Sequence, residues 1–495
     1  RSADRRYLTS YKIRSLHVFW HNDTTTIIRD ENPERKGMGA KQRIYTEGVL
    51  YYTVLKIRTD FRKGRQEDVM ERNDPRYQAY VEILKEELIP AMGCTEPIAL
   101  AYAAAKAREV LGVLPDSVQL QVSGSIIKNV KSVIVPNTGH LKGMEAAVAA
   151  GIIAGSAEKE LEVISEVSEE KKSAIRDYLQ TVPITIEHTE QGHVFDIVVT
   201  ERCGQDYARV RIADYHTNIC RIEKNGTVLY EVPLLDETVQ ENARADRSLL
   251  NMQDIWDFAE TADLRDVADL LERQIRYNNA IAEEGLLGDY GANIGRVLLT
   301  TYGNDVSNRA KAKAAAGSDA RMNGCELPVI INSGSGNQGI TCSVPLIEYA
   351  KELHSGKEKL YRALIISNLV AIHEKTGIGT LSAYCGAVSA GAGAGAGIVY
   401  LCGDGYQAAI HTVVNALAIV SGIVCDGAKA SCAAKIASSV DAALLGYNMY
   451  KCNQEFKGGD GIVMKDIETT IKGIGRLGKD GMRQTNEEII RLMMS

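Results

Sequence analysis

A cysteine at residue 94 stands where a helix is expected to begin. After Pro90 the chain reads GCTEP, residues 93–97, and then continues as an alanine-rich run. Pro90 should end any preceding helix, and Thr95 is expected to cap the next one, with Pro97 in its first turn. Free backbone amides and the positive end of the helix dipole favour a thiolate there. Cys94 is therefore a candidate catalytic group; the alternative is a small buried apolar side chain.

Three further cysteines could hold a metal cluster. Cys385 precedes a run of Gly and Ala, and Cys425 and Cys432 lie seven positions apart in GIVCDGAKASC. In one regular helix the last two would stand about 10 Å apart on the same face. The Asp-Gly pair after Cys425 predicts an interruption, with Cys425 ending one helix and Cys432 in the first turn of the next. Cysteines so placed can converge on a multinuclear cluster, or they are simply buried small residues. No CxxC pair indicates a zinc ribbon or a ferredoxin-type motif.

A polar stretch between residues 319 and 345 could hold a carboxylate. Residues 332–339 read NSGSGNQG and open a predicted helix, so their backbone amides could bind an anion. Arg321 could add a bidentate contact to the same group. The alternative is a plain connecting loop. The candidate substrate-binding residues of this stretch are Arg321, Asn332, Ser333 and Asn337.

The elements that must position these residues predict an α+β fold, with a mixed α/β N-terminal domain followed by an all-helical domain. Alternating apolar residues predict strands within 117–139 and 181–232. Apolar and small-residue patterns predict helices elsewhere. The expected helices cover 71–90, 96–112, 143–155, 251–284, 291–315, 337–353, 357–375, 383–401, 405–425, 429–448 and 483–494. The predicted domains are 71–245, carrying the GCTEP block, and 246–495, carrying the cluster.

Residues 1–70 differ from the rest of the chain. They hold 15 Lys and Arg against 9 Asp and Glu, and their hydrophobic periodicity is poor. We interpret them as a basic N-terminal extension that is either loosely ordered or translated from upstream of the real start. A targeting peptide is disfavoured by the acidic residues.

Composition excludes several classes of protein. The 495 residues are 45% hydrophobic and 24% charged, which is typical of a globular protein. A net charge of −7 argues against a general nucleic-acid binder, and ten cysteines are too few for a disulfide scaffold. We therefore expect a cytoplasmic protein. Residues 376–403 carry no charge but are mostly Gly, Ala and Ser, which indicates closely packed buried helices rather than membrane spans.

Taken together, these blocks resemble the L-cysteine desulfidases and the larger group of iron–sulfur L-serine dehydratases. The resemblance covers roughly residues 71–495. The blocks that carry it, in chain order, are GCTEPIALA (93–101), SGSIIKNVKSVIVPNTGHLKGMEAAVAAGIIAG (123–155), DARMNGCELPVIINSGSGNQGI (319–340), CGAVSAGAGAGAGIVYLCG (385–403) and IVCDGAKASCAAK (423–435).

The resemblance implies a reaction and a cofactor. In that family three cysteines bind a [4Fe–4S] cluster and leave one iron open, which carries over to Cys385, Cys425 and Cys432. The cysteine of the GCTEP block is the family's proposed base, here Cys94. The serine dehydratases have a Ser/His-rich block where GCTE stands, and they place more than six residues between their last two core ligands. Both departures favour a carbon–sulfur lyase that converts L-cysteine to sulfide, ammonia and pyruvate.

Alternatives remain open at this point. The same cluster could serve an L-serine or L-threonine dehydratase, or a non-enzymatic iron–sulfur sensor, although no DNA-binding helix is evident. A membrane protein built on 376–425 is a third reading. No lysine stands in a context that calls for pyridoxal phosphate. The expected partner is a small amino acid, without nucleic acid or membrane, and the small-residue helices could pack within one chain or across a homodimer.

Overall fold

The computed structural model describes residues 10–13, 16–21, 24–29, 70–189, 193–234, 244–379 and 382–494. The chain divides into two compact units, residues 1–69 and residues 70–495. In the first unit, β1 (Ser10–Ile13), β2 (Leu16–His21) and β3 (Thr24–Arg29) pair antiparallel in that order. The predicted loose order of the rest of this extension lies outside the described residues.

The second unit contains a six-stranded sheet in the order β10-β9-β8-β7-β5-β6. Its strands β5 and β6 are parallel and all other neighbours are antiparallel. Alternate residues of β8, namely Ala208, Val210 and Ile212, are fully buried, as the two-residue period of a strand requires. The strands are β5 (Ser117–Ser123), β6 (Ile184–Thr189), β7 (Asp196–Cys203), β8 (Asp206–Ala213), β9 (Ile219–Lys224) and β10 (Thr227–Glu231).

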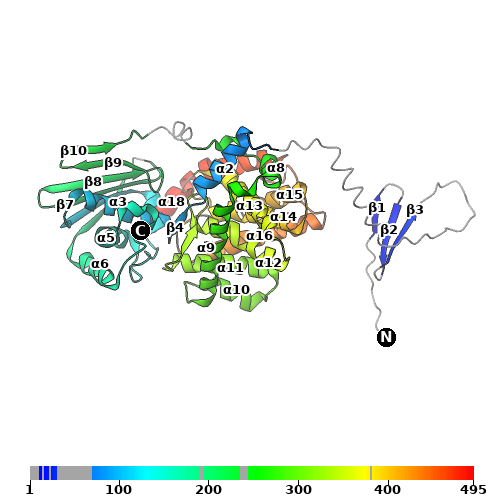
Figure 1. The fold of residues 1–495 in the computed structure, drawn as a ribbon, viewed down its shortest axis with the longest axis horizontal. Helices are drawn as coiled ribbons and strands as arrows, with labels where there is room; N and C mark the ends of the chain where they lie inside the picture. Colours follow the sequence, from blue (N-terminus) through cyan, green and yellow to red (C-terminus); the bar gives the residue numbers. More distant parts are fainter. Residues whose placement is uncertain are drawn as a thin grey trace, which may run out of the picture. The chain divides into compact units, whose positions relative to one another are not determined.

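Helices cover one face of this sheet in layers. The helix α3 (Thr95–Leu111) packs on β7 and β8, α5 (Gly143–Ala154) packs on α3, and α6 (Glu169–Thr181) packs on α5 (Figure 1). The short helix α4 (Gly124–Val130) follows β5 directly. The prediction of strands throughout 117–139 is therefore wrong after Ser123, where the chain turns into a fully buried helix.

The remainder of the unit is mainly helical, which agrees with the predicted α+β class. Its glycine-rich helix α14 contacts α12, α13, α15 and α16. A Cβ atom on Gly393 would lie 2.4 Å from the carbonyl oxygen of Ser367 in α13, so only glycine permits this approach. The helices are α2 (Pro75–Glu87), α8 (Met252–Thr261), α9 (Ala268–Leu287), α10 (Ile294–Tyr302), α11 (Val306–Met322), α12 (Gly336–Glu352), α13 (Lys357–Ile378), α14 (Gly386–Cys402), α15 (Tyr406–Val420), α16 (Cys432–Lys451), α17 (Ile467–Arg476) and α18 (Arg483–Met494).

Two of the helices predicted from the sequence are each divided into two helices in the structure. The segment 251–284 breaks where Ala262 leaves the helical conformation and Asp263 caps a short 3₁₀ turn. The segment 291–315 breaks at Gly303, whose φ is +88°, and Asp305 caps the following helix by accepting from the amide of Asn308. Polar caps at these positions interrupt an otherwise continuous apolar period. The helices α6 and α17 were not predicted, nor were the short strands Pro90–Met92 and Pro328–Ile330.

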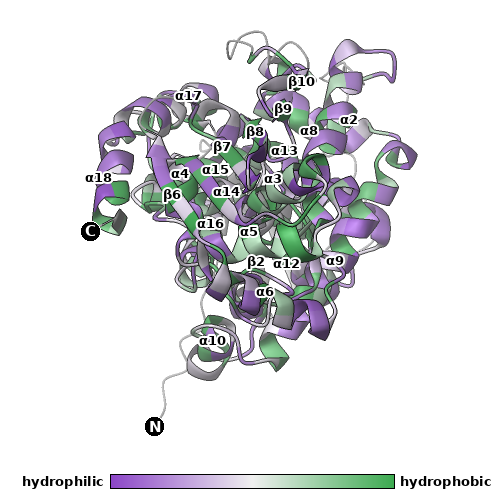
Figure 2. Cartoon of the chain, turned by 90° about the vertical axis from the view of Figure 1, so that its left-hand side faces the viewer, coloured by the Kyte–Doolittle hydropathy of each residue, from purple (hydrophilic) through white to green (hydrophobic). Residues whose placement is uncertain are grey.

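Hydropathy distinguishes the outer helices from the inner ones. The helix α18 is coloured largely as hydrophilic in Figure 2, whereas nearly every residue of α14 is buried. Within the described residues, no helix has the length and apolar character needed to cross a bilayer.

Candidate active site

A two-stranded ribbon brings the GCTEP block to the polar loop. The strand β4 (Pro90–Met92) pairs antiparallel with β11 (Pro328–Ile330), with Met92 opposite Pro328, and this pairing joins the strand before the GCTEP block to the strand before the polar loop. Cys94 is the N-cap residue of α3, as its predicted place before a helix requires. Thr95, predicted to be the cap, is instead the first helical residue, and its hydroxyl donates to the carbonyl oxygen of Gly334 at 3.1 Å.

Cys94 forms a buried pair with Glu96. Its thiol is 2% exposed and donates to Glu96 Oε2 at 3.0 Å, while Asn129 donates to the other oxygen of that carboxylate at 3.0 Å. Burial, followed by the negative charge of Glu96, raises the pKa of Cys94 well above its ordinary value. The expectation of a resting thiolate is therefore wrong, because these two effects outweigh the helix N-terminus.

The loop after β11 is held in a tight turn by its own amides. Asn332 is fully buried and donates to Asn368 Oδ1 at 3.0 Å, and Ser333 donates to Asn332 Oδ1 at 2.9 Å. These two predicted binding residues thus shape the loop. Asn337 is the second residue of α12, and its Oδ1 is buried without a hydrogen-bond partner. It is the one member of this trio whose side chain has an unused polar atom.

Arg321 lies in the last turn of α11, against the same loop. A Cβ atom on Gly336 would lie 2.3 Å from its Nε, so the guanidinium contacts the backbone at the start of α12. The residue is 2% exposed, and its Nε has no hydrogen-bond partner. No ion pair joins Arg321 to any carboxylate of the described residues. A buried cation in this state calls for an anionic ligand.

The three candidate cluster cysteines lie at one junction of helices. Cys385 is the N-cap residue of α14, which begins three residues later than the expected 383–401 helix. Cys432 is the first residue of α16, in agreement with its predicted place in the first turn of a helix. Cys425 was predicted to end a helix, but α15 ends at Val420, and Cys425 lies in the irregular segment that follows.

Backbone hydrogen bonds bring two of these cysteines together. The Cys385 amide donates to the carbonyl of Ile423 at 3.1 Å, and the Cys425 amide donates to that of Ala383 at 2.6 Å. Burial, and then the neighbouring thiols of Cys425 and Cys432, raise the pKa of Cys385 to about 12. The three thiols are therefore electrostatic neighbours.

Contacts also connect the polar loop to the cysteine junction. A Cβ atom on Gly386, the residue after Cys385, would lie 2.5 Å from Gln338 Cδ, so the Gln338 side chain lies directly against the start of α14. The Oε1 atom of Gln338 is buried without a partner. Loop 332–339 thus contacts Thr95 on one side and the beginning of α14 on the other.

Comparisons with known proteins identify the family. The sequence model of the serine dehydratase alpha chain matches residues 158–491. The chain belongs to that family. It is 61% identical over 426 residues to UPF0597 protein DSY1109 of Desulfitobacterium hafniense (strain Y51), which covers 86% of this chain and 99% of that protein. It is also 52% identical over 419 residues to a UPF0597 protein of Lachnoclostridium phytofermentans, covering 85% of this chain and 100% of that protein. The names of these relatives state no reaction.

The donor set of this serine dehydratase family member fits an iron–sulfur cluster. Within the described ranges, no group of three or more His, Cys, Asp or Glu side chains is arranged to hold a metal ion directly. Cluster ligands bind separate irons and need not converge on one point, and thiolates are the usual ligands. Lys375 lies near Cys385 and Cys425, and burial lowers its pKa to about 8. Buried lysines beside thiols would compensate the negative charge of a thiolate-bound cluster.

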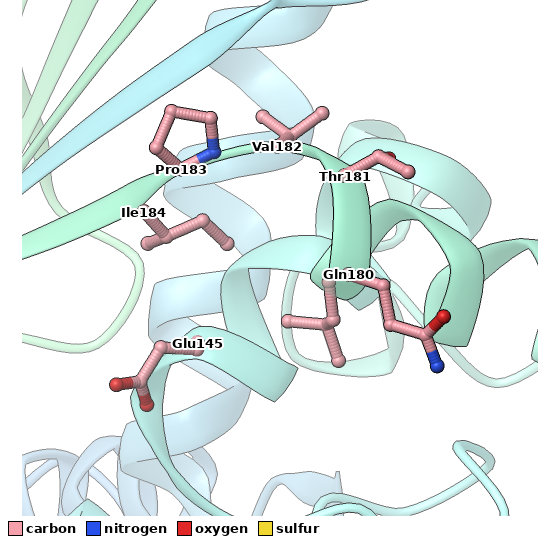
Figure 3. A pocket seen from close by; sticks show the side chains of 7 residues that line it. Glu145, Gln180, Thr181, Val182, Pro183 and Ile184 are labelled. Carbon is pink, nitrogen blue, oxygen red and sulfur yellow. The ribbon is translucent and has the colours of Figure 1, made fainter.

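Two surface hollows of this family member lie away from the candidate site residues. Figure 3 shows one of about 420 Å³ where α6 meets β6. None of the candidate site residues lines it. Its lining residues are Glu145, Leu179, Gln180, Thr181, Val182, Pro183 and Ile184.

Several residues at the site were missed by sequence reasoning. Glu96 stands within the GCTEP block but received no role, because its pairing with Cys94 depends on side-chain directions. Gln338 lies in the predicted loop, next to residues that were named. His216 lies in the short polar segment that follows β8, and a polar break after an alternating strand was its only signal.

Proposed function

We propose that this protein is a lyase that eliminates the β-substituent of a small L-amino acid, with L-cysteine as its substrate. The observation that carries the proposal is the meeting, on one loop, of the Cys94–Glu96 pair with an unpaired buried arginine, Arg321. An acid–base pair beside an anion site suits removal of a proton next to a carboxylate. Membership in the serine dehydratase family supports the reaction class.

Cys94 and Glu96 are the proton-handling groups of this proposal. The thiol must lose its proton before the sulfur can accept one from the substrate Cα, and Glu96 Oε2, at 3.0 Å, is placed to take it. Asn129 fixes the other oxygen of Glu96 and so orients the carboxylate. The substrate ammonium brings a positive charge into the site, which favours the charged thiolate.

Arg321 and the loop hold the substrate carboxylate. The free Nε–H of Arg321 and the amides at the start of α12 are donors that an α-carboxylate can use. Asn337 and Gln338 have unused amide oxygens nearby, which can accept from the substrate ammonium. A zwitterion would thus satisfy polar atoms that are otherwise buried without partners.

Cys385, Cys425 and Cys432 are the residues that would hold a [4Fe–4S] cluster. When bound, such a cluster with one open iron supplies a Lewis acid for the leaving group. The reaction balances as L-cysteine plus water giving hydrogen sulfide, ammonia and pyruvate. The carbon–sulfur bond breaks, and the water hydrolyses the imine that forms from 2-aminoacrylate.

L-serine is the second candidate substrate, because the matching family is that of serine dehydratases. The same residues would bind its carboxylate and remove its Cα proton. The leaving group would then be hydroxide, which departs less readily than hydrosulfide and depends more on the Lewis acid.

The deciding experiment is anaerobic purification followed by iron and labile-sulfide analysis and by assays with L-cysteine and L-serine. We expect a brown protein with about four irons and four sulfides per chain. We also expect pyruvate release with a higher kcat/KM for L-cysteine. Cys385→Ala should lose iron, whereas Cys452→Ala, at an exposed cysteine outside the junction, should not. A reconstituted protein without iron, or one inactive on both amino acids, would contradict the proposal.

A further inference from the structure

His216 is a buried imidazole that the proposed reaction does not yet use. It lies in the segment between β8 and β9, and its ring packs edge-to-face on Phe195 with centroids 4.7 Å apart. The residue as a whole is partly exposed, but its Nε2 is inaccessible to solvent and has no hydrogen-bond partner. An unpartnered buried ring nitrogen is costly and indicates a missing ligand.

The surroundings of His216 are those of the candidate active site. A Cβ atom on Gly334 would lie 3.5 Å from His216 Cε1, so the ring contacts the loop that also receives the Thr95 hydroxyl. Glu96 and Arg321 both act electrostatically on the imidazole, with opposite effects on its pKa. The histidine is thus a neighbour of both the proton-handling pair and the anion site.

The ionisation of His216 limits what it can do. Burial is the larger influence and Arg321 adds to it, and together they hold the pKa of His216 below its ordinary value despite Glu96. The ring is therefore neutral near pH 7 and is a weak proton acceptor. A neutral imidazole can still donate one N–H, and beside a guanidinium the group that it meets is most favourably an anion.

We infer that His216 Nε2–H donates a hydrogen bond to the α-carboxylate of the substrate, alongside the Nε–H of Arg321. This role deepens the proposed function and rests on it. When the Cα–H bond breaks, the proton passes to the Cys94 sulfur. The electron pair of the broken bond moves into the substrate carboxylate. That pair then forms the Cα–Cβ double bond as the side-chain sulfur leaves.

Two donors at the carboxylate would stabilise the extra negative charge that it carries between these steps. Donors fixed where charge develops are worth far more in a buried site than in water. His216 therefore acts on kcat more than on substrate binding, since its hydrogen bond strengthens as the carboxylate gains charge.

The test compares His216→Phe with His216→Gln. Phenylalanine keeps the edge-to-face contact with Phe195 but removes the N–H, and glutamine restores a donor. We expect His216→Phe to lower kcat roughly 100- to 1,000-fold, with a smaller change in KM, and His216→Gln to recover part of the loss. His411→Phe is the matched control, because His411, in α15, also packs against an aromatic ring, which is that of Tyr450. Thermal unfolding of each variant reports whether the fold is kept.

Calorimetric titration with L-alanine, which has no leaving group, separates this inference from the proposed function. We expect the wild-type protein to bind L-alanine, and His216→Phe to bind it about 10-fold more weakly. Equal binding together with equal kcat in a folded His216→Phe protein would overturn the role of His216 alone.

A wild-type protein that binds L-alanine through His216 yet turns over neither L-cysteine nor L-serine would overturn the proposed function. The carboxylate contact would stand in that case. A wild-type protein that neither binds L-alanine nor acts on either amino acid would overturn both.

Discussion

The thiol of Cys94 experiences opposing effects within a few ångströms. The N-terminus of α3 and the charge of Arg321 favour a thiolate, while burial and the carboxylate of Glu96 favour the neutral thiol. Burial is the largest of these effects, so the resting state of Cys94 is a neutral thiol whose S–H donates a hydrogen bond to Glu96. In the proposed reaction, Cys94 acts as a base only when a positive group enters the site. Proton removal is thereby linked to occupation by an ammonium-bearing substrate.

The Arg321→Met variant tests the anion site at this scale. Methionine keeps much of the apolar volume against Gly336 but removes the buried charge. We expect KM for the amino acid to rise roughly 10- to 100-fold, because hydrogen bonds to a charged group are lost. Steady-state kinetics measures this. Arg296→Met, at an exposed arginine on α10, is the control, and an unchanged KM in Arg321→Met would remove this residue from the site.

At the scale of elements, the segment between α15 and α16 decides whether the cysteines meet. Gly427 has a φ of +94°, and a Cβ atom there would lie 2.0 Å from the carbonyl oxygen of Lys128 in α4. The turn is therefore possible only with glycine. It lies within the irregular segment that carries Cys425 and connects α15 to α16, where Cys432 is the first residue. The predicted interruption at Asp426-Gly427 is confirmed.

The Gly427→Ala variant should disturb this turn. We expect the free energy of unfolding to fall by more than about 2 kcal/mol, because a positive φ and a backbone collision are imposed together. Iron per chain should fall as well, since Cys425 and Cys432 would shift. Denaturant unfolding and iron analysis measure the two effects. Gly422→Ala is the control in the same segment, because its Cβ would meet nothing within 4 Å. Equal behaviour of the two variants would contradict this account.

At the scale of the whole residue 70–495 unit, the C-terminal helix contacts the sheet region. The helix α18 packs on α4, and Asn486 accepts a hydrogen bond from the buried Lys128 ammonium at 2.6 Å. Lys128 is 1% exposed, and burial lowers its pKa. The last helix of the chain thus satisfies a cation in an early one, close to the cysteine junction.

Asn486→Ala should therefore destabilise the protein more than a substitution near the surface normally does. We expect the free energy of unfolding to fall by about 1–3 kcal/mol, because Lys128 would lose its closest acceptor in a buried site. Asn486→Asp should keep the wild-type stability, since it retains an acceptor and adds an opposite charge. Thermal unfolding compares the three proteins. A stable Asn486→Ala protein would show that Lys128 finds another partner.

The amino-acid sequence by itself determined the local features. The positions of proline and glycine and the apolar periodicity located α3, α5, α12, α13 and most strands of the six-stranded sheet, because these signals act over a few residues. The GCTEP block, the polar loop and the three cysteines were recognisable as candidate chemistry for the same reason. Polar N-cap residues such as Asp305 lie within long apolar patterns. They divide helices that the apolar periodicity alone predicts to be continuous.

The tertiary structure decided which of these groups meet and in what state. The pairing of β4 with β11 and the hydrogen bond from Thr95 to Gly334 connect the GCTEP block to loop 332–339 across more than two hundred residues, and no local pattern encodes these contacts. Burial, which depends on the whole unit, sets the protonation of Cys94 and leaves Arg321 without an ion pair among the described residues. His216 became a candidate only because folding left its Nε2 buried and unpartnered beside both. Residue types follow from sequence, but charge states and partners depend on the packing of distant segments.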